Sequence, residues 1–415
     1  MKIIVLGAGV VGVTSAHHLA RDGHQVTVVD RQPVAANETS WGNAGLVSPG
    51  HAYSWASPTA PKKLIQSLYK DDTALRWRPN ADPRLWSFSI GFLWNCTTKK
   101  ARANTFIKAK FARYSQLMLD RVAGETGIAF DRTTRGLIYC YPTQASLDAA
   151  AKRMAVIIEA GIRLDVVDSR RALEIEPALA NSQHKFAGAI YAPTDESGDC
   201  NLFTRHLADW CAARGVKFRY ETTIERLVMS GGRVERVITD KGDLTADAYV
   251  LSLGSYSPFL SRTARINLPI FPVKGYSMTI PIEGRNGAPT IGGVDEHTLL
   301  GWSRLGDRLR ITSIAEISGY DTGHTPEDFT GMMKAARALF PDGADWSKAI
   351  YWAGLRPMTP TSLPIIGRSR HENLWLNTGH GSLGWTLSNG SGAALADLIA
   401  GRKPEHDIAS FAPRN

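Results

Sequence analysis

One arginine stands apart from any acid in the stretch GLRPMTPTSLPIIG, residues 354–367. Its neighbours there are glycines, prolines and small polar or apolar residues. A guanidinium keeps its charge in a protein, and burying it without a partner is costly. Arg356 is therefore a candidate functional residue whose partner has to come from outside this stretch.

Three glycines near the start of the chain have the spacing of a dinucleotide-binding loop. Residues 2–12, KIIVLGAGVVG, predict a buried strand that runs into Gly7-x-Gly9-x-x-Gly12. A helix and a second strand are expected next, and Asp30 ends that strand. Such a loop presents bare N–H groups and the positive end of a helix to phosphates, and the acid suits a ribose hydroxyl. The pattern predicts that this end of the chain binds a dinucleotide.

The segment after the second strand bears on which dinucleotide is bound, because the glycine loop alone does not separate NAD from FAD. Residues 38–50, ETSWGNAGLVSPG, are small and polar. They either line a flavin that extends past its pyrophosphate or form a surface loop of turn-forming residues. The residues that would face the flavin are Glu38, Thr39, Ser40 and Asn43. Arg31 would suit a 2′-phosphate, but the acid before it favours a bare ribose.

Later segments are predicted to return to the same domain. Residues 201–228 indicate a helix followed by a strand, and residues 246–257 a strand that ends in a glycine turn. Residues 373–401 indicate a strand, a glycine loop and a helix. The loop, residues 379–384, offers bare N–H groups where that helix begins, and these can stabilise an anionic ring edge. His380 within it has no second ligand at a usable spacing, so we expect no metal site.

The segments between these have a different character. Residues 84–95 are rich in aromatic side chains, and residues 268–282 and 307–320 predict strands of a mostly antiparallel sheet. We therefore expect a discontinuous cofactor domain interleaved with a sheet-based substrate domain that also carries helices, with the catalytic cleft between them. The predicted boundaries are residues 1–50, 196–256 and 345–412 for the first domain, and residues 51–195 and 257–344 for the second.

Composition excludes several classes of protein. A chain of 415 residues that is 43% hydrophobic and 21% charged is typical of a globular protein with two domains. The four cysteines have no CxxC spacing, which favours a reduced, cytoplasmic compartment and argues against a zinc site or disulfides. No apolar run is long enough to span a membrane.

The basic residues are concentrated in one segment. The formal net charge is +9, and residues 99–113 hold six basic residues and no acid. This segment is either a solvated helix face or a surface that contacts anionic lipid. Nucleic-acid binding is disfavoured because no recognition motif accompanies the charge.

Taken in chain order, these segments resemble the bacterial FAD-dependent D-amino acid dehydrogenases, within the wider D-amino acid oxidase and glycine oxidase superfamily. The resemblance rests on the glycine loop with Asp30 and on six further segments: ETSWGNAGLVSPG, DESGDCNLFT (195–204), LSLGSYS (251–257), PVKGYSMTIPI (272–282), GLRPMTP and NTGHGSLGWT (377–386). It covers nearly the whole chain. It implies an α/β fold with a Rossmann-type FAD domain and a mostly antiparallel substrate domain.

The resemblance also implies an activity. The expected enzyme oxidises CH–NH2 or CH–NH donors, passing a hydride from the Cα of a D-amino acid to flavin N5. Water then converts the imino acid to the 2-oxo acid and ammonia. Electrons would go to a quinone-type acceptor, which would give the basic segment the purpose of peripheral docking on the cytoplasmic face of an inner membrane through Lys99, Lys100, Lys108 and Lys110. A homo-oligomer remains open.

Site residues follow from the same resemblance. Arg356 matches the arginine that holds the substrate carboxylate, the alternative being a structural arginine bonded to backbone carbonyls. Pocket candidates are His51, Tyr53 and Tyr276, none of which is compelled to act as a base. The expected flavin contacts are Gly7, Gly9, Val10, Val11, Gly12, Asp30, Arg31, Thr39, Ser40, Asn43, Gly45, Leu46, Ile224, Gly254, Gly381, Ser382, Leu383, Gly384, Trp385 and Thr386.

Three departures from the family pattern leave the substrate side chain open. They are Trp41-Gly42, His51-Ala52-Tyr53-Ser54-Trp55, and Thr361-Ser362-Leu363-Pro364. A cyclic substrate such as D-proline or hydroxy-D-proline and a neutral one such as D-alanine both remain open. Other functions kept open are a glycine or sarcosine-type oxidase that uses oxygen, and a flavin subunit active only in a larger complex.

Overall fold

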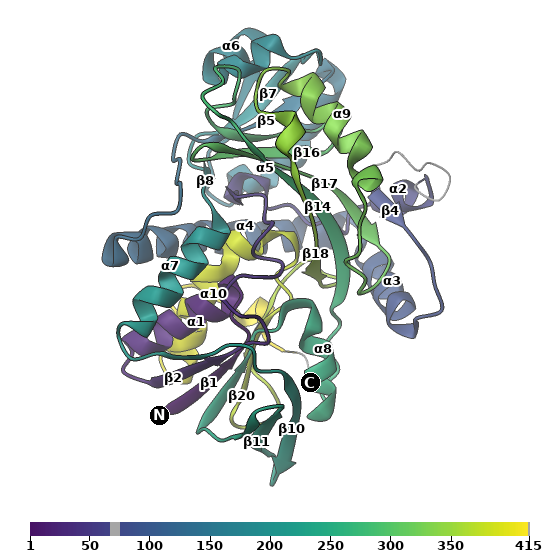
Figure 1. Cartoon of the computed structure of the whole chain (residues 1–415). Coiled ribbons are helices and arrows are strands. Elements are labelled where there is room, and N and C mark those ends of the chain that lie inside the picture. Colours follow the sequence, from purple (N-terminus) through teal and green to yellow (C-terminus); the bar gives the residue numbers. More distant parts are fainter. Residues whose placement is uncertain (67–74, 414–415) are drawn as a thin grey trace.

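The computed structural model describes residues 1–66 and 75–413. Within these residues the strands form a six-stranded sheet, a nine-stranded sheet and two small sheets. The six-stranded sheet lies in the lower half of Figure 1, beside both chain ends, and the nine-stranded sheet lies in the upper half.

The six-stranded sheet has the Rossmann-type arrangement expected from the glycine loop. Strand β1 (Lys2–Leu6) pairs in parallel with β2 (Gln25–Val29) and β13 (Ala248–Leu251). The sheet order is β19-β20-β13-β1-β2-β9, with β9 (Lys217–Arg219), β20 (Leu374–Thr378) and β19 (Ile365–Arg368) completing it. Chain segments from three distant parts of the sequence thus form one sheet, as predicted.

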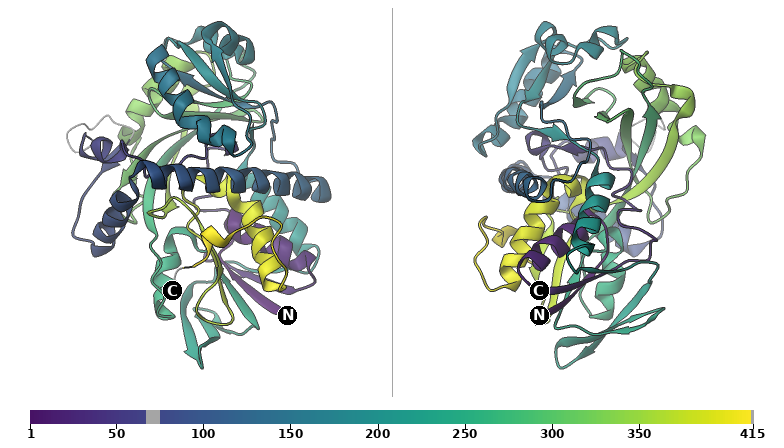
Figure 2. Two further views of the ribbon diagram at one scale, coloured as in Figure 1. Left: turned by 180° about the vertical axis from the view of Figure 1, so that it is seen from behind. Right: turned by 60° about the vertical axis from the view of Figure 1, so that its left-hand side comes forward.

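Apolar spacing in the sequence produces the helices that cover this sheet. In α7 (Cys200–Ala212) the buried residues include Cys200, Phe203, Leu207 and Cys211, one face of a helix that begins at the capping carboxylate of Asp199. Helices α1 (Val10–Arg21), α10 (Gly384–Ile399) and α4 (Thr98–Thr126) share the same core. Figure 2 shows α4 crossing the molecule between the two large sheets.

The nine-stranded sheet is mostly antiparallel, as predicted. Its order is β18-β14-β17-β16-β15-β5-β7-β6, with β4 beside β17. The strands are β18 (Ile350–Met358), β14 (Phe271–Pro281), β17 (Arg308–Ile317), β16 (Leu300–Leu305), β15 (Gly292–Asp295), β5 (Leu137–Tyr141), β7 (Gly188–Ala192), β6 (Asp165–Asp168) and β4 (Leu75–Trp77). Two pairings, β15 with β5 and β17 with β4, are parallel.

Strand β18 bears on the proposed domain boundaries. Its residues fall in the segment 345–412 that we assigned to the cofactor domain, yet the strand pairs with β14 along its length. Conversely, α4 falls in the segment 51–195 assigned to the substrate domain but contributes Phe111 and Met118 to the core of the six-stranded sheet. We propose moving the boundaries to the end of β18 and to both ends of α4.

The remaining elements are short or peripheral. The small sheets are β10 (Ile224–Ser230) with β11 (Arg233–Thr239) and β12 (Gly242–Leu244), and β3 (Leu46–Val47) with β8 (Glu196–Ser197). The other helices are α2 (Ala60–Gln66), α3 (Pro83–Asn95), α5 (Gln144–Glu159), α6 (Ser169–Ile175), α8 (Ser257–Thr263) and α9 (Thr330–Leu339). No helix among the described residues has the length and apolar character needed to cross a bilayer.

Candidate active site

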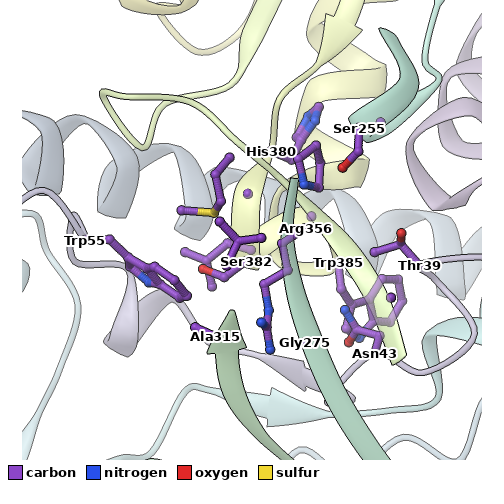
Figure 3. A pocket seen from close by; sticks show the side chains of 18 of the residues that line it. Thr39, Asn43, Trp55, Ser255, Gly275, Ala315, Arg356, His380, Ser382 and Trp385 are labelled. Atoms are coloured by element: carbon purple, nitrogen blue, oxygen red, sulfur yellow. The ribbon is translucent and has the colours of Figure 1, made fainter. Parts of the chain in front are cut away.

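A cavity of about 1180 Å³ lies where the two large sheets meet. Its volume exceeds the roughly 300–1,000 Å³ of a pocket for one small ligand, so it has room for a cofactor and a substrate. Every residue predicted for the site lines this cavity except Gly12, Gly45 and Thr386. Figure 3 shows side chains around it from the loop after β2, from strand β18 and from helix α10, among them Thr39, Arg356 and Trp385.

Backbone atoms form the end of the cavity beside β1. Gly7 has φ +112°, and a Cβ there would lie 2.6 Å from the carbonyl oxygen of Ser252. Gly12 does not line the cavity because it packs inward: a Cβ there would lie 1.9 Å from the carbonyl oxygen of Gly7. Ser40 accepts a hydrogen bond from the N–H of Val10 at 3.1 Å and so ties residues 38–50 to the start of α1.

The acid at the end of β2 is held by backbone donors. Asp30 Oδ2 accepts from the N–H of Ala8 at 2.6 Å and Oδ1 from the N–H of Gln32 at 2.8 Å. Burial raises the pKa of this carboxyl, and the two N–H donors oppose that rise. A carboxylate has about four acceptor positions, so Asp30 keeps capacity for a ligand hydroxyl. Beside it, Arg31 donates to Glu38 at 2.7 Å.

The segment that predicted a flavin-lining strip is fixed by the nine-stranded sheet. Thr39 donates to the carbonyl oxygen of Leu355 at 2.9 Å. Arg310 donates to the carbonyl oxygens of Trp41 at 3.1 Å and Asn43 at 2.8 Å, and burial lowers the pKa of this guanidinium to about 10. Sequence reasoning missed Arg310, because nothing in its local pattern indicates a contact with residues so distant in the chain.

The C-terminal glycine loop presents a helix start to the cavity. Gly379 and Gly381 have φ of +75° and +61°, and residues 381–385 line the cavity at the start of α10. The start of α10 has neither a side-chain cap nor an acid in its first turn. The positive end of the helix that faces the cavity is therefore not neutralised by the helix's own residues. Burial lowers the pKa of His380 to about 3, so it is neutral, and its Nε2 lies 3.1 Å from Ser391 Oγ.

These features fit FAD. Gly7 and Gly9 line the cavity where α1 begins, so a pyrophosphate can approach the backbone there, and the uncapped start of α10 suits the electron-rich edge of a flavin ring. Trp385 adds a buried indole N–H that has no hydrogen-bond partner among the described residues. The two ends lie in one cavity, as an extended dinucleotide requires. Ile224 and Gly254 also line it.

Arg356 reaches into the other part of the cavity from β18, running past Gly275 in Figure 3. Its Nη1 donates to the carbonyl oxygens of Ile314 at 3.0 Å and Lys274 at 3.3 Å. Among the described residues it forms no ion pair, and neither Nε nor Nη2 has a bond to a protein group. Burial lowers its pKa to about 10, so the guanidinium stays charged at neutral pH.

A bulge in β17 aims one of those carbonyls. The register between β14 and β17 shifts at Gly275, which leaves Ile314 as the extra residue, and Ile314 has φ +58°. A β-branched residue in the left-handed region is strained, and strain of this kind persists where the surrounding structure holds it. The bulge thus places one acceptor for Nη1 and leaves the rest of the guanidinium facing the cavity.

Paired glycines let two large side chains lie across the sheet. Gly275 pairs with Gly354. A Cβ at Gly275 would lie 2.3 Å from Arg356 Cζ, and one at Gly354 would lie 1.9 Å from the Trp352 ring. Sequence reasoning missed Trp352, although residues 352, 354 and 356 alternate onto one face of a strand and all line the cavity.

The three pocket candidates line the cavity, and the side chains of His51 and Tyr276 have hydrogen-bond partners there. His51 Nε2 lies 2.7 Å from Glu296 Oε1, and its ring stacks on Tyr139 at 4.5 Å. Burial raises the pKa of Tyr53 well above its ordinary value. Tyr276 donates to Glu316 at 3.2 Å, and burial raises its pKa as well. The raised pKa values keep Tyr53 and Tyr276 protonated at neutral pH, so neither tyrosine is prepared to act as a base.

Known proteins match the chain along nearly its full length. A family model described as FAD dependent oxidoreductase matches residues 2–398. D-amino acid dehydrogenase 2 of Mesorhizobium japonicum is 47% identical over 408 residues, which span 98% of each chain. D-amino acid dehydrogenase of Chromohalobacter salexigens is 44% identical over 408 residues, spanning 98% of this chain and 97% of that one.

Solved structures agree on the fold. Glycine oxidase from Geobacillus kaustophilus has a TM-score of 0.75 at 21% identity, covering 100% of this chain and 99% of that one. L-proline dehydrogenase from P. horikoshii has a TM-score of 0.75 at 18% identity, covering 99% of this chain and 96% of that one. The predicted fold class is confirmed. With its glycine cradle, its interleaved sheets and these matches, the chain belongs to the family of FAD-dependent oxidoreductases and uses FAD as its cofactor.

Proposed function

We propose that the protein is a D-amino acid dehydrogenase that converts a D-amino acid to the 2-oxo acid and ammonia. The observation that carries the proposal is Arg356, a charged guanidinium whose Nε and Nη2 have no partner in the part of the chain that the structure describes. It lies in a cavity that also has the dinucleotide cradle. Handedness and substrate class come from the names of the relatives, because the solved neighbours include enzymes for glycine and for L-proline.

The residues act mainly by positioning. Arg356 holds the substrate carboxylate through its free donors, and the planar fork fixes the orientation of the acid. The substrate amine is neutral when it reacts, and its proton leaves to water or to a carbonyl oxygen of the pocket. Bound FAD supplies the acceptor for the hydride that leaves Cα. Water then hydrolyses the imino acid, so no side chain is required as a general base.

The side-chain subsite lies against the pocket candidates and Trp352. Aromatic walls with few free polar groups favour an apolar side chain, either a small one as in D-alanine or a ring as in D-proline. Both remain within the proposal.

The acceptor is proposed to be a quinone, with the protein bound peripherally to a membrane. The basic segment 99–113 supports this less than the sequence suggested. Lys108 is only 3% exposed, and its Nζ donates to the carbonyl oxygen of Tyr53 at 2.8 Å, so it cannot contact lipid. Arg102 pairs with Glu159. Lys99, Lys100 and Lys110 remain as candidates.

A glycine or sarcosine-type oxidase is the second candidate, favoured by the fold shared with glycine oxidase. The two functions differ in the fate of the electrons. Hydrogen peroxide produced at the rate of substrate turnover would identify the oxidase.

An anaerobic panel of D- and L-amino acids, including both prolines and glycine, tests the proposal. The purified yellow protein is mixed with each acid, and loss of flavin absorbance is recorded. We expect bleaching by D-amino acids only. Bleaching by L-proline or glycine alone would contradict the proposal. Failure of all acids, with dye reduction restored by a partner protein, would indicate the flavin subunit of a complex.

A further inference from the structure

Helix α3 is apolar on two opposite faces. Leu85 and Phe88 are buried in a core cluster with Phe271 and Val273 of β14. The opposite face consists of Trp86, Ile90, Leu93 and Trp94, which are 45%, 67%, 49% and 76% exposed. Their spacing places all four on one side of the helix, the α3 apolar face. Folding of this chain alone therefore leaves two tryptophans and two aliphatic side chains in contact with water.

Positive charge borders the α3 apolar face. The next helix, α4, begins with Lys99 and Lys100 directly after α3 ends. Lys100 Nζ lies 4.9 Å from the centre of the Trp94 ring and donates to the Trp94 carbonyl oxygen at 2.9 Å. Helix α2, whose Leu64 packs against the α3 cluster, carries exposed Lys62 and Ile65. Helices α2 and α3, which carry these side chains, lie at one edge of the molecule, at the right of Figure 1.

We propose that the α3 apolar face docks on the surface of an anionic lipid bilayer. Tryptophan and aliphatic side chains enter the boundary between headgroups and acyl chains, while lysines beside them attract anionic headgroups. A second copy of the chain is the weaker occupant, because a two-fold interface through this face would set the lysines of each copy near those of the other.

Helix α3 also connects this face to the active site. Phe88 and Phe92 line the cavity from one side of the helix, together with Leu64 of α2 and Trp55. A lipid-soluble electron acceptor that leaves the bilayer at the α3 apolar face therefore has an apolar route to the cavity. Both steps rest on the proposed function: docking gives the proposed peripheral membrane contact its surface, and the second step gives the proposed quinone its route.

Sedimentation with vesicles of phosphatidylglycerol and phosphatidylethanolamine tests the docking. The double variant Ile90→Glu with Trp94→Glu should bind vesicles at least about tenfold more weakly than the parent. The matched control is Ile158→Glu on α5, a helix position that is 51% exposed, and it should bind as the parent does. Lys62→Glu with Lys99→Glu should lose the part of binding that salt screens.

Turnover separates docking from the rest of the proposal. With a water-soluble dye all variants should match the parent. With a quinone embedded in vesicles, turnover by Ile90→Glu with Trp94→Glu should fall by about tenfold, turnover by the lysine variant should fall less, and turnover by Ile158→Glu should not change. Vesicle binding is measured without substrate, so a failed amino acid panel leaves this test intact.

Three outcomes would overturn the inference. In the first, the parent does not bind anionic vesicles. In the second, Ile90→Glu with Trp94→Glu binds them as well as the Ile158→Glu control. In the third, the parent is a dimer that does not bind vesicles, and Ile90→Glu with Trp94→Glu is a monomer. If Ile90→Glu with Trp94→Glu does not fold, a second measurement decides. Brominated lipids should quench the tryptophan fluorescence of the parent, and they should quench that of Trp86→Phe with Trp94→Phe less.

Discussion

The two halves of the active site are built in different ways. Beside β1 the cavity is made of backbone, with glycines at positions 7 and 9 and a helix start within one short segment. Beside β18 it is made of side chains, and the partners of Arg356 come from residues 42 and 82 positions away in the chain. The first half depends on residues having no side chain, and the second on strand register.

This difference determines which changes each half tolerates. At Gly12 a single methyl group meets backbone that cannot move. At Gly275 the same methyl group meets the end of a flexible arginine. The predictions below test this contrast, in order of decreasing effect.

Replacement of Gly12 by valine should remove the first half altogether. The new Cβ would fall 1.9 Å from the Gly7 carbonyl oxygen, so α1 cannot pack on β1. We expect a colourless or insoluble protein, with flavin retention reduced by more than about 100-fold. Absorbance of the purified protein measures this. Gly124→Ala, at an exposed helix position with open space, should keep full flavin content.

Replacement of Arg356 by lysine should leave the first half intact and disable the second. Lysine keeps the charge but loses the planar fork, so the carboxylate is held by one bond without fixed orientation. We expect a rise in KM of about 100-fold with normal flavin content. Steady-state kinetics with a soluble dye measure it, and an unchanged KM would assign Arg356 a structural role.

A buried lysine behind the pocket wall should titrate. Lys108 on α4 donates to Tyr53 in the pocket wall, and burial lowers its pKa from 10.5 to about 7. The unfolded chain therefore binds a proton more readily than the folded one. Burial of Lys108 therefore lowers the free energy of unfolding. This destabilisation is absent above pH 10.5, grows as the pH falls from 10.5 to about 7, and is complete below pH 7.

Lys108→Met should remove that contribution. The variant should gain about 2 kcal/mol in unfolding free energy at pH 6 relative to the parent, and less at pH 9, after allowance for the lost bond to Tyr53. Urea denaturation at both pH values measures this. A gain that does not change with pH would mean that Lys108 is not titrating in this range.

Replacement of Gly275 by alanine should give the smallest effect. The methyl group would displace the guanidinium rather than the strand, so we expect KM to rise about tenfold while the melting temperature and flavin content hold. Gly331→Ala on α9, where a Cβ meets nothing, is the matched control. An equal KM for Gly275→Ala and Gly331→Ala would show that the position of the Arg356 guanidinium does not depend on the space beside Gly275.

The sequence predicted the half of the site that is built from backbone better than the half that is built from side chains. The glycine cradle, Asp30 and the strands β1, β2, β13, β20, β14 and β17 were predictable because each depends on local spacing. Arg310 and the bulge at Ile314 were not, because both act across strands that meet only after folding. Lys108 was misplaced on the surface for a related reason: a run of basic residues does not indicate which face of a helix each one occupies.

The position of a bound substrate carboxylate tests the central claim most directly. A crystal of the flavin-loaded protein, soaked anaerobically with a D-amino acid that bleaches it, should show the carboxylate hydrogen-bonded to Nε and Nη2 of Arg356. A carboxylate bound elsewhere in the cavity, with Arg356 still bonded only to the carbonyls of Ile314 and Lys274, would contradict the account.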